Sequence, residues 1–236
     1  MDFSSDPIGY AIWDFKTNGS SENIVVQSDM CDDDLLQPSY LCRSFDEMPE
    51  IEKFALLNVE GKTLDVGAGS GCHAQYLIDK GHEVMAIDSS RNAIELLKSQ
   101  QINALCTEFE NYSADQFDTV LLLMNGLGLA KRLSNLDQFL LKLKSLIKPN
   151  GKIICDSSDI SYLFKEEDGG MWMDLNAEYF GEMKFNMVYK DVESGWFDWI
   201  YVDPNTLKEH CEKVRLSCEI IFEGENDHYL AELKHL

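Results

Sequence analysis

Residues 64–74 read LDVGAGSGCHA, and this stretch decides the fold class. An apolar run at residues 62–66 predicts a buried strand that leads into Gly67, Gly69 and Gly71, and a helical segment follows. Glycine can adopt backbone dihedrals closed to other residues and lets a ligand approach the main chain closely. The first amides of the helix are free hydrogen-bond donors. The stretch therefore predicts a ligand-binding turn between a strand and a helix.

Strands and helices alternate regularly around this turn. Apolar runs predict strands at 83–87, 104–106, 117–124 and 152–155, and helical spacing predicts helices at 73–80, 90–100 and 135–146, with a turn at 149–151. Such alternation is typical of right-handed βαβ units and a parallel sheet. The strands are apolar on both faces, as in a sheet covered by helices on both sides.

The two ends of the chain are expected to elaborate this core within the same domain. Residues 1–60 contain a helix start at Pro38 and helical spacing over 50–57, which predicts an N-terminal helical cap before the domain proper at 61–236. After residue 180, strands are expected at 181–189 and 195–202, a helix at 205–214, and closing strands at 217–223 and 228–233. This part is predicted to be antiparallel and attached to the sheet edge.

Asp88 ends the second strand about twenty residues after the glycines, where a carboxylate can accept both hydroxyls of a ribose. Two kinds of site share this arrangement. The dinucleotide fingerprint is G-x-G-x-x-G, but here Cys72 occupies the position of its third glycine, and the acidic Asp65 lies two residues before Gly67.

The D-x-G-x-G-x-G pattern at 65–71 resembles the class I S-adenosylmethionine-dependent methyltransferases. The resemblance covers about residues 60–157 and includes the loop at 148–152, KPNGK, before the fifth strand. Residues 125–128 and 156–159, with the aromatic C-terminal hairpin, resemble a group of small bacterial methyltransferases. The implied fold is a Rossmann-like three-layer α/β sandwich. Its seven-stranded sheet is mostly parallel with an antiparallel C-terminal strand, and a β-hairpin elaborates the C-terminal part.

The resemblance implies S-adenosylmethionine as cofactor, S-adenosylhomocysteine as product, and a set of binding positions. The methionine part would lie along the glycine turn, the ribose on Asp88, the adenine near the end of the third strand, and the methyl-transfer site at the exit of the fourth. The implied residues are Asp65, Gly67, Ala68, Gly69, Gly71, Asp88, Ser89, Glu108, Phe109, Met124 and Asn125. His73 faces the cofactor or packs, and Arg43 pairs with the cofactor carboxylate or with a neighbouring acid.

Methyl transfer depends chiefly on alignment of the acceptor with the sulfonium methyl, because the cofactor carries the reactive carbon. A general base is needed only if the acceptor must lose a proton. The catalytic candidates are Asn125 and Asp156, which follow the fourth and fifth strands. A structural or helix-capping role for Asp156 is the alternative.

The distribution of charged residues along the chain indicates what kind of acceptor to expect. The net charge is −22, with 13 acidic against 3 basic residues in 1–60, 11 against 10 in 61–157, and 18 against 7 in 158–236. Acidic flanks disfavour nucleic acid. Aromatic residues gather in 171–201 beside Asp174, Glu178 and Asp198, which suits a cationic amine. We therefore expect a small neutral or cationic acceptor, methylated on nitrogen or oxygen; the alternative is that the acid serves only solubility.

The remaining expectations concern environment and rival functions. Seven scattered cysteines without close pairs indicate a reducing, cytoplasmic setting with neither disulfides nor a metal site. The apolar runs are too short to span a membrane. The rival functions are a module that binds S-adenosylmethionine without catalysis and an NAD-dependent oxidoreductase. The sequence leaves the oligomeric state open.

Overall fold

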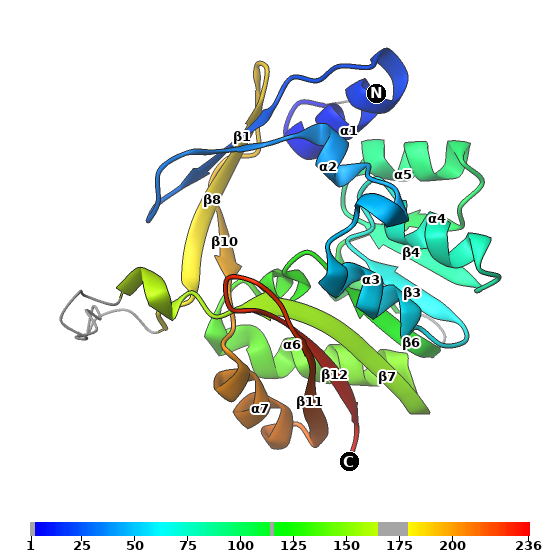
Figure 1. The fold of residues 1–236 in the computed structure, drawn as a ribbon, viewed down its shortest axis with the longest axis vertical. Helices are drawn as coiled ribbons and strands as arrows, with labels where there is room; N and C mark the ends of the chain where they lie inside the picture. Colours follow the sequence, from blue (N-terminus) through cyan, green and yellow to red (C-terminus); the bar gives the residue numbers. More distant parts are fainter. Residues whose placement is uncertain (1–2, 114–115, 165–178) are drawn as a thin grey trace.

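The computed structural model describes residues 3–113, 116–164 and 179–236, in which two sheets form (Figure 1). The strands of the larger sheet are β3 (Thr63–Val66), β4 (Val84–Asp88), β5 (Ala104–Cys106), β6 (Phe117–Leu122), β7 (Ile147–Ser158), β11 (Leu216–Glu223) and β12 (His228–His235). Their order is β11-β12-β7-β6-β3-β4-β5. Strands β3 to β7 pair in parallel, and β12 is antiparallel to both of its neighbours, β7 and β11. The predicted mostly parallel seven-stranded sheet is confirmed.

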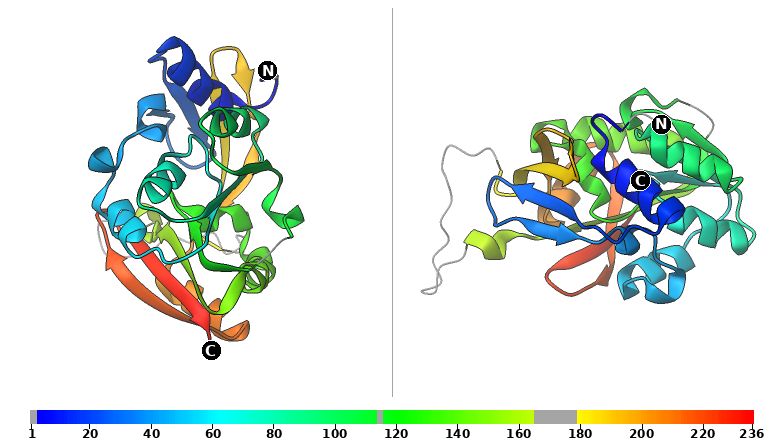
Figure 2. Two further views of the ribbon diagram at one scale, coloured as in Figure 1. Left: turned by 90° about the vertical axis from the view of Figure 1, so that its right-hand side faces the viewer. Right: turned by 90° about the horizontal axis from the view of Figure 1, so that it is seen from above.

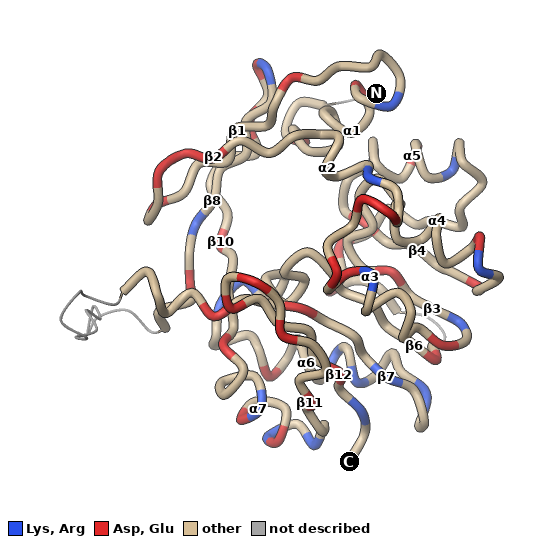
Figure 3. The backbone as a smooth tube through the Cα atoms, in the orientation of Figure 1, with Lys and Arg blue, Asp and Glu red and all other residues tan. Residues whose placement is uncertain are grey.

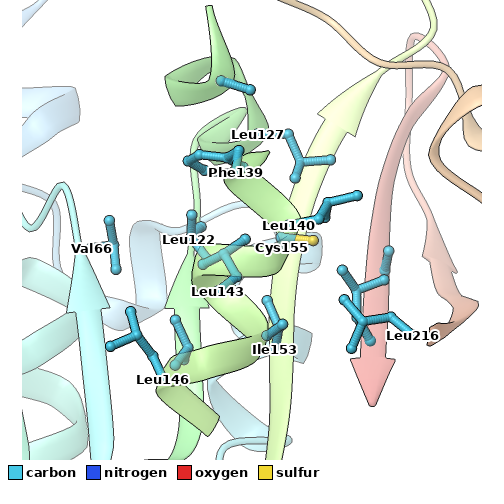
Figure 4. Packing of buried hydrophobic residues seen from close by; sticks show 14 of the residues in the cluster. Val66, Leu122, Leu127, Phe139, Leu140, Leu143, Leu146, Ile153, Cys155 and Leu216 are labelled. Carbon is cyan, nitrogen blue, oxygen red and sulfur yellow. The ribbon is translucent and has the colours of Figure 1, made fainter. Parts of the chain in front are cut away.

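Helices cover both faces of this sheet. One apolar core joins it to α3 (Glu50–Leu57), α4 (Cys72–Asp79) and α5 (Arg91–Ser99), and a second joins it to α6 (Leu133–Leu146) and α7 (Pro204–Lys213). The apolar positions of α6 recur at the helical period and are all buried: Leu136, Phe139, Leu140, Leu143 and Leu146. Figure 4 shows this face of α6 packed over Leu122, Ile153 and Cys155. The three-layer sandwich expected from the alternation is therefore present.

The smaller sheet departs from expectation. It contains β1 (Ile24–Ser28), β2 (Asp34–Leu36), β8 (Glu182–Tyr189), β9 (Val192–Glu193) and β10 (Phe197–Ile200), all antiparallel. Its main order is β10-β8-β1-β2. Figure 2 shows β1 and β8 side by side. The prediction that the hairpin of β8 and β10 attaches to the edge of the larger sheet is wrong, because it pairs with the N-terminal segment.

The N-terminal segment is accordingly more than a helical cap. It holds α1 (Pro7–Asn18), α2 (Pro38–Leu41) and η1 (Phe45–Glu47) besides its two strands. The sequence analysis missed α1 although its signals are regular. Asp6 caps it by accepting from the Gly9 amide at 2.8 Å, Pro7 opens it, and Gly19 closes it in a left-handed conformation. The remaining short helices are η2 (Phe109–Asn111), η3 (Gly126–Ala130) and η4 (Ser161–Phe164).

The expected turn at 149–151 lies within β7. The ladder between β6 and β7 pairs Phe117 with Ile147 and then Thr119 with Lys152, so β7 bulges between these pairs. A bulge takes up extra residues without ending the strand. The Pro-Asn-Gly signal thus marks an irregularity in one long strand rather than a turn before a new one.

Asp14 of α1 ties the helix to the end of β8. Its carboxylate accepts from the Tyr189 hydroxyl at 2.8 Å and from the Lys190 ammonium, and these hydrogen bonds help hold its pKa at about 2, below the ordinary 3.8. A lowered folded pKa stabilises the protein above pH 4, and that stability is lost as the pH falls through 2.

Replacing Asp14 with asparagine should therefore lower the free energy of unfolding by about 2 kcal/mol at pH 7. The difference from wild type should shrink between pH 4 and pH 2. Urea unfolding across this range measures both effects, with the exposed Glu22→Gln as a control that leaves stability unchanged. A pH-independent difference would mean that the Asp14 charge has no such role.

Candidate functional site

The glycine turn after β3 is held against β4 by the backbone. The amides of Gly67 and Ala68 donate to the carbonyl of Ile87 at 2.9 and 3.1 Å, and the three glycines of the turn have φ of 73°, 52° and 78°. A Cβ on Gly71 would lie 2.2 Å from Leu97 of α5, so this glycine lets α4 pack closely against α5. Gly67 and Gly69 line a cavity instead.

This cavity lies at the carboxyl ends of the parallel strands and has a volume of about 340 Å³. That is the size of a small-molecule site. Most of the residues expected to bind the cofactor line it: Asp65, Gly67, Ala68, Gly69, His73, Asp88, Ser89, Glu108, Phe109 and Met124. The structure brings these positions from four strand ends to one cavity. Gly71, Asn125 and Arg43 are not among its lining residues.

Asp88 braces the glycine turn. One carboxylate oxygen accepts from the Gly69 amide at 2.8 Å and the other from the Ser90 amide at 2.7 Å. Burial raises the pKa of the Asp88 carboxyl, and these two amide hydrogen bonds oppose the rise. Each oxygen keeps a lone pair for a further donor.

Asp65 is buried at the base of the cavity. Burial raises the pKa of its carboxyl to about 6, and its Oδ2 has no hydrogen-bond partner among the described residues. An unsatisfied buried oxygen of this kind calls for a donor. The ammonium group of a bound amino acid moiety, such as the methionine part of S-adenosylmethionine, fits this requirement.

Arg43 and His73 belong to a buried network behind the glycine turn. Arg43 forms an ion pair with Glu52, and the other oxygen of Glu52 contacts His73 Nε2 at 2.9 Å. Burial lowers the pKa of His73, but Cys72, Glu52 and Asp65 outweigh this effect and hold it well above the ordinary value. Of the two readings of Arg43, the ion pair with a neighbouring acid is the one observed, whereas His73 both packs and lines the cavity.

The catalytic candidates Asn125 and Asp156 lie next to residues of the cavity wall. Asn125, at φ 59°, accepts from the Ser158 hydroxyl at 2.9 Å. Asp156 is fully buried; its Oδ1 accepts from the Gly126 amide at 3.0 Å and its Oδ2 contacts His228 Nε2 at 2.8 Å. Neither residue is among those that line the cavity, and their catalytic role stays a prediction.

Several lining residues were missed by the sequence analysis. α1 and α2 contribute Ile8, Ile12 and Leu41, and β10 contributes Trp199. The Trp199 ring packs so closely on η3 that a Cβ on Gly128 would lie 1.9 Å from it. Single apolar residues outside the glycine motif carry no local signal of a site. Contacts between segments far apart in the sequence bring them to the cavity, such as those of Asp6 with Ser90 and of Ser70 with Leu41.

The aromatic C-terminal region is divided between core and site. Tyr189 is fully buried, Trp199 lines the cavity, and Asp198 forms an ion pair with Arg132 at 2.9 Å. Asp198 is thus committed to Arg132 rather than open to an amine. Trp172, Asp174 and Glu178 lie outside the described residues.

Comparisons with known proteins agree with this geometry. A family model described as a methyltransferase domain matches residues 64–155. The chain is 40% identical to an S-adenosylmethionine-dependent methyltransferase from Bacteroides fragilis, solved in complex with S-adenosyl-L-homocysteine. That alignment covers 100% of this chain and 98% of the other, with a TM-score of 0.92. The chain therefore belongs to the S-adenosylmethionine-dependent methyltransferases.

Two further relatives are more distant. The CcbJ methyltransferase from Streptomyces caelestis is 13% identical with a TM-score of 0.63, over 82% of this chain and 99% of that one, and shares the fold. The ubiquinone biosynthesis O-methyltransferase of Rickettsia typhi (strain ATCC VR-144 / Wilmington) is 33% identical over 110 residues, 43% of this chain and 44% of the relative. The chain matches less than half the length of this curated relative.

Three further observations concern the described part of the chain as a whole. Across 3–113, 116–164 and 179–236, none of the helices combines the length and apolarity needed to cross a bilayer. The same residues hold no group of three or more His, Cys, Asp or Glu side chains suited to a metal ion. All seven cysteines are free thiols.

The raised pKa of Asp65 makes cofactor binding pH-dependent. Because the folded pKa of about 6 exceeds the ordinary 3.8, ionising Asp65 destabilises the empty protein, and a bound ammonium offsets this penalty. The affinity for S-adenosylhomocysteine should fall as the pH drops below about 6, by up to roughly tenfold per pH unit. Calorimetry between pH 5 and pH 7.5 measures this. Asp65→Asn should bind more weakly and lose the dependence, and an equal slope in the variant would contradict the assignment.

Proposed function

We propose that this protein transfers the methyl group of S-adenosylmethionine to a nitrogen or oxygen of a small neutral or cationic acceptor. When bound, the cofactor supplies an electrophilic methyl group on a sulfonium centre. The chain's own residues hold it and align the acceptor: the glycine turn and Asp65 at the methionine end, Asp88 at the ribose, and Glu108 with Phe109 at the adenine. Family membership and the shared cavity support these assignments.

The observation that carries the acceptor class is the charge of the cavity lining. The carboxylates are Asp6, Asp65, Asp88, Glu108 and Glu110. Among the described lining residues, Lys131 is the one lysine or arginine. Its ammonium group forms an ion pair with Glu110 at 3.2 Å. A negative lining raises the local concentration of cations and repels anions.

The surface charge around the site has the same sign. Figure 3 shows acidic residues in the turn between β1 and β2 and in the turn between β11 and β12, whereas lysines gather near the start of β7. The starts of parallel strands lie at the sheet edge opposite the cavity. This distribution supports a role for the acidic flanks in acceptor choice beyond solubility.

We further propose that residues 1–60 select the acceptor as part of the same domain as 61–236. Asp6 supports this, because it accepts from Ser90 Oγ at 2.6 Å and Asn92 Nδ2 at 2.9 Å and so fixes α1 to α5. Ser70 of the glycine turn donates to the carbonyl of Leu41. The free thiols favour a cytoplasmic location.

The function is tested by binding and turnover together. S-adenosylhomocysteine should stabilise the fold by about 2.7 kcal/mol at a hundredfold excess over its Kd, whereas nicotinamide nucleotides should not raise the Tm. Methyl-labelled S-adenosylmethionine is then offered with a panel of amines, phenols and their phosphorylated analogues, and products are read by mass spectrometry. We expect transfer to an amine or phenol and at least tenfold slower transfer to its phosphorylated analogue. Preference for the anion would contradict the acceptor class, and binding without turnover would indicate a cofactor-binding module.

A further inference from the structure

A histidine–aspartate pair lies at the carboxyl edge of the larger sheet, where β7 ends and β12 begins. His228 opens β12 opposite Ser158, the last residue of β7. Its Nε2 contacts Oδ2 of Asp156 at 2.8 Å, and the two side chains are 25% and 0% exposed. Figure 1 shows the start of β12 beside the end of β7.

The pair is anchored to the wall of the cavity. The second oxygen of Asp156 accepts from the amide of Gly126, and Gly126 itself lines the cavity next to the exit of β6. Asp156 is fully buried and is not among the residues that line the cavity. It can act only through the groups that it holds, and one of these is a partly exposed imidazole.

The carboxylate fixes the state of that imidazole. Because Asp156 accepts a hydrogen bond, Nε2 of His228 carries the proton, and Nδ1 of the neutral ring keeps its lone pair. Nδ1 has no hydrogen-bond partner among the residues that the structure describes. A ring with one nitrogen held by a buried carboxylate and the other nitrogen open is arranged as a proton acceptor.

The turn before β12, the segment after β7 and α2 supply the titratable groups around the ring. The turn before β12 carries Glu225, whose carbonyl accepts from the His228 amide, and Asp227, whose carbonyl accepts from the amide of Asp159 after β7. On the side of α2, Tyr40 lies close enough for Asp156 to raise its pKa, although burial is the larger cause. The ring of Tyr40 in turn carries the guanidinium of Arg43, 4.1 Å from its centre, so the elements packed around His228 supply both acidic groups and a cation.

We propose that His228 is the general base of methyl transfer and that Asp156 is its positioning residue. This inference rests on the proposed function. As the acceptor nitrogen or oxygen bonds to the methyl carbon, the carbon–sulfur bond breaks and sulfur keeps its electron pair. The proton of the acceptor N–H or O–H passes to Nδ1 of His228. The resulting imidazolium is held by Asp156 and returns its proton to solvent through the exposed part of the ring.

The test compares His228→Gln with His235→Gln, a matched change at the far end of the same strand, where His235 Nε2 lies 3.5 Å from the Ile147 carbonyl oxygen. The substrate is the most active amine or phenol of the panel described above. His228→Gln should lower kcat by about 10²- to 10⁴-fold and leave the affinity for S-adenosylhomocysteine within twofold. In the dependence of kcat on pH, the variant should no longer show the fall at low pH that protonation of the enzyme's base causes. His235→Gln should match wild type.

The outcomes separate this inference from the function on which it rests. A merely structural His228 would lower Tm and cofactor affinity but keep the wild-type shape of the pH profile, and that result overturns the proposal. Asp156→Asn, which keeps the volume but cannot hold an imidazolium, should also lower kcat, and an unchanged kcat there counts against the pair. If wild type transfers no methyl to any panel member, the proposed function fails and the role of His228 fails with it.

Discussion

Replacing Asp88 with alanine is expected to weaken the binding of S-adenosylhomocysteine at least tenfold. The change removes a carboxylate placed to accept the ribose hydroxyls, and hydrogen bonds to a charged group contribute roughly 1.5–3 kcal/mol each. It also removes the acceptor of the Gly69 amide, so the glycine turn loses a brace. Titration calorimetry at constant pH measures the effect.

The Tm should change little, because the loss of two amide hydrogen bonds is offset by removing a carboxylate whose burial is unfavourable. Asp118→Ala is the matched control. Asp118 also accepts from a backbone amide, that of Lys62 at 2.8 Å, but it starts β6 at the opposite edge of the sheet. Its replacement should leave affinity unchanged. Equal losses in the two variants would show that the ribose does not lie on Asp88.

Replacing Gly128 with alanine is expected to displace Trp199 from the cavity and to lower kcat/KM for the acceptor at least tenfold. The new Cβ would lie 1.9 Å from the indole ring, so one of the two segments must move. Overpacking of this kind costs typically 1–3 kcal/mol. The affinity for S-adenosylhomocysteine should change much less, because the glycine turn is built by other elements.

A second substitution checks that the cause is steric. In the Gly128→Ala background, Trp199→Phe shortens the ring and should restore part of the acceptor kcat/KM, although Trp199→Phe alone lowers it. Gly19→Ala serves as a control for backbone strain, since Gly19 has φ 69° but nothing within 4 Å of its Cβ position. That variant should lose stability and keep activity. Additive effects of Gly128→Ala and Trp199→Phe would contradict the clash.

The parts of the fold that were predicted correctly rest on local signals. The buried stripe of α6 and the bounds of β5 follow from periodicity and apolar runs. The glycine turn and Asp88 are equally local, because a turn needs particular dihedrals and a parallel strand ends at a known edge. Ten of the predicted cofactor-binding positions line the cavity.

What the sequence analysis missed depends on contacts between distant segments. Pairing of β1 with β8 joins residues such as Gln27 and Asn186, which are 159 positions apart. Spacing of residues within a segment does not predict a pairing between segments so far apart. The ion pair of Arg43 with Glu52 was left as one of two alternatives, because a lone arginine has many acidic partners in an acidic chain. His228 carried no signal, since its role arises only when β12 is laid against β7.

The smaller sheet can form only late in synthesis, because its strands lie far apart in the sequence. β1 leaves the ribosome early, but its partner β8 follows only after the 159 residues that separate Gln27 from Asn186. At about 5–20 residues per second, the wait is roughly 8–30 s. During that time β1 has an unpaired edge on the side of β8, whereas the parallel strands from β3 to β7 complete their pairing sooner. Unpaired strand edges can pair with other chains and so promote aggregation, and the carboxylates of the turn at 29–34 put negative charge beside this edge.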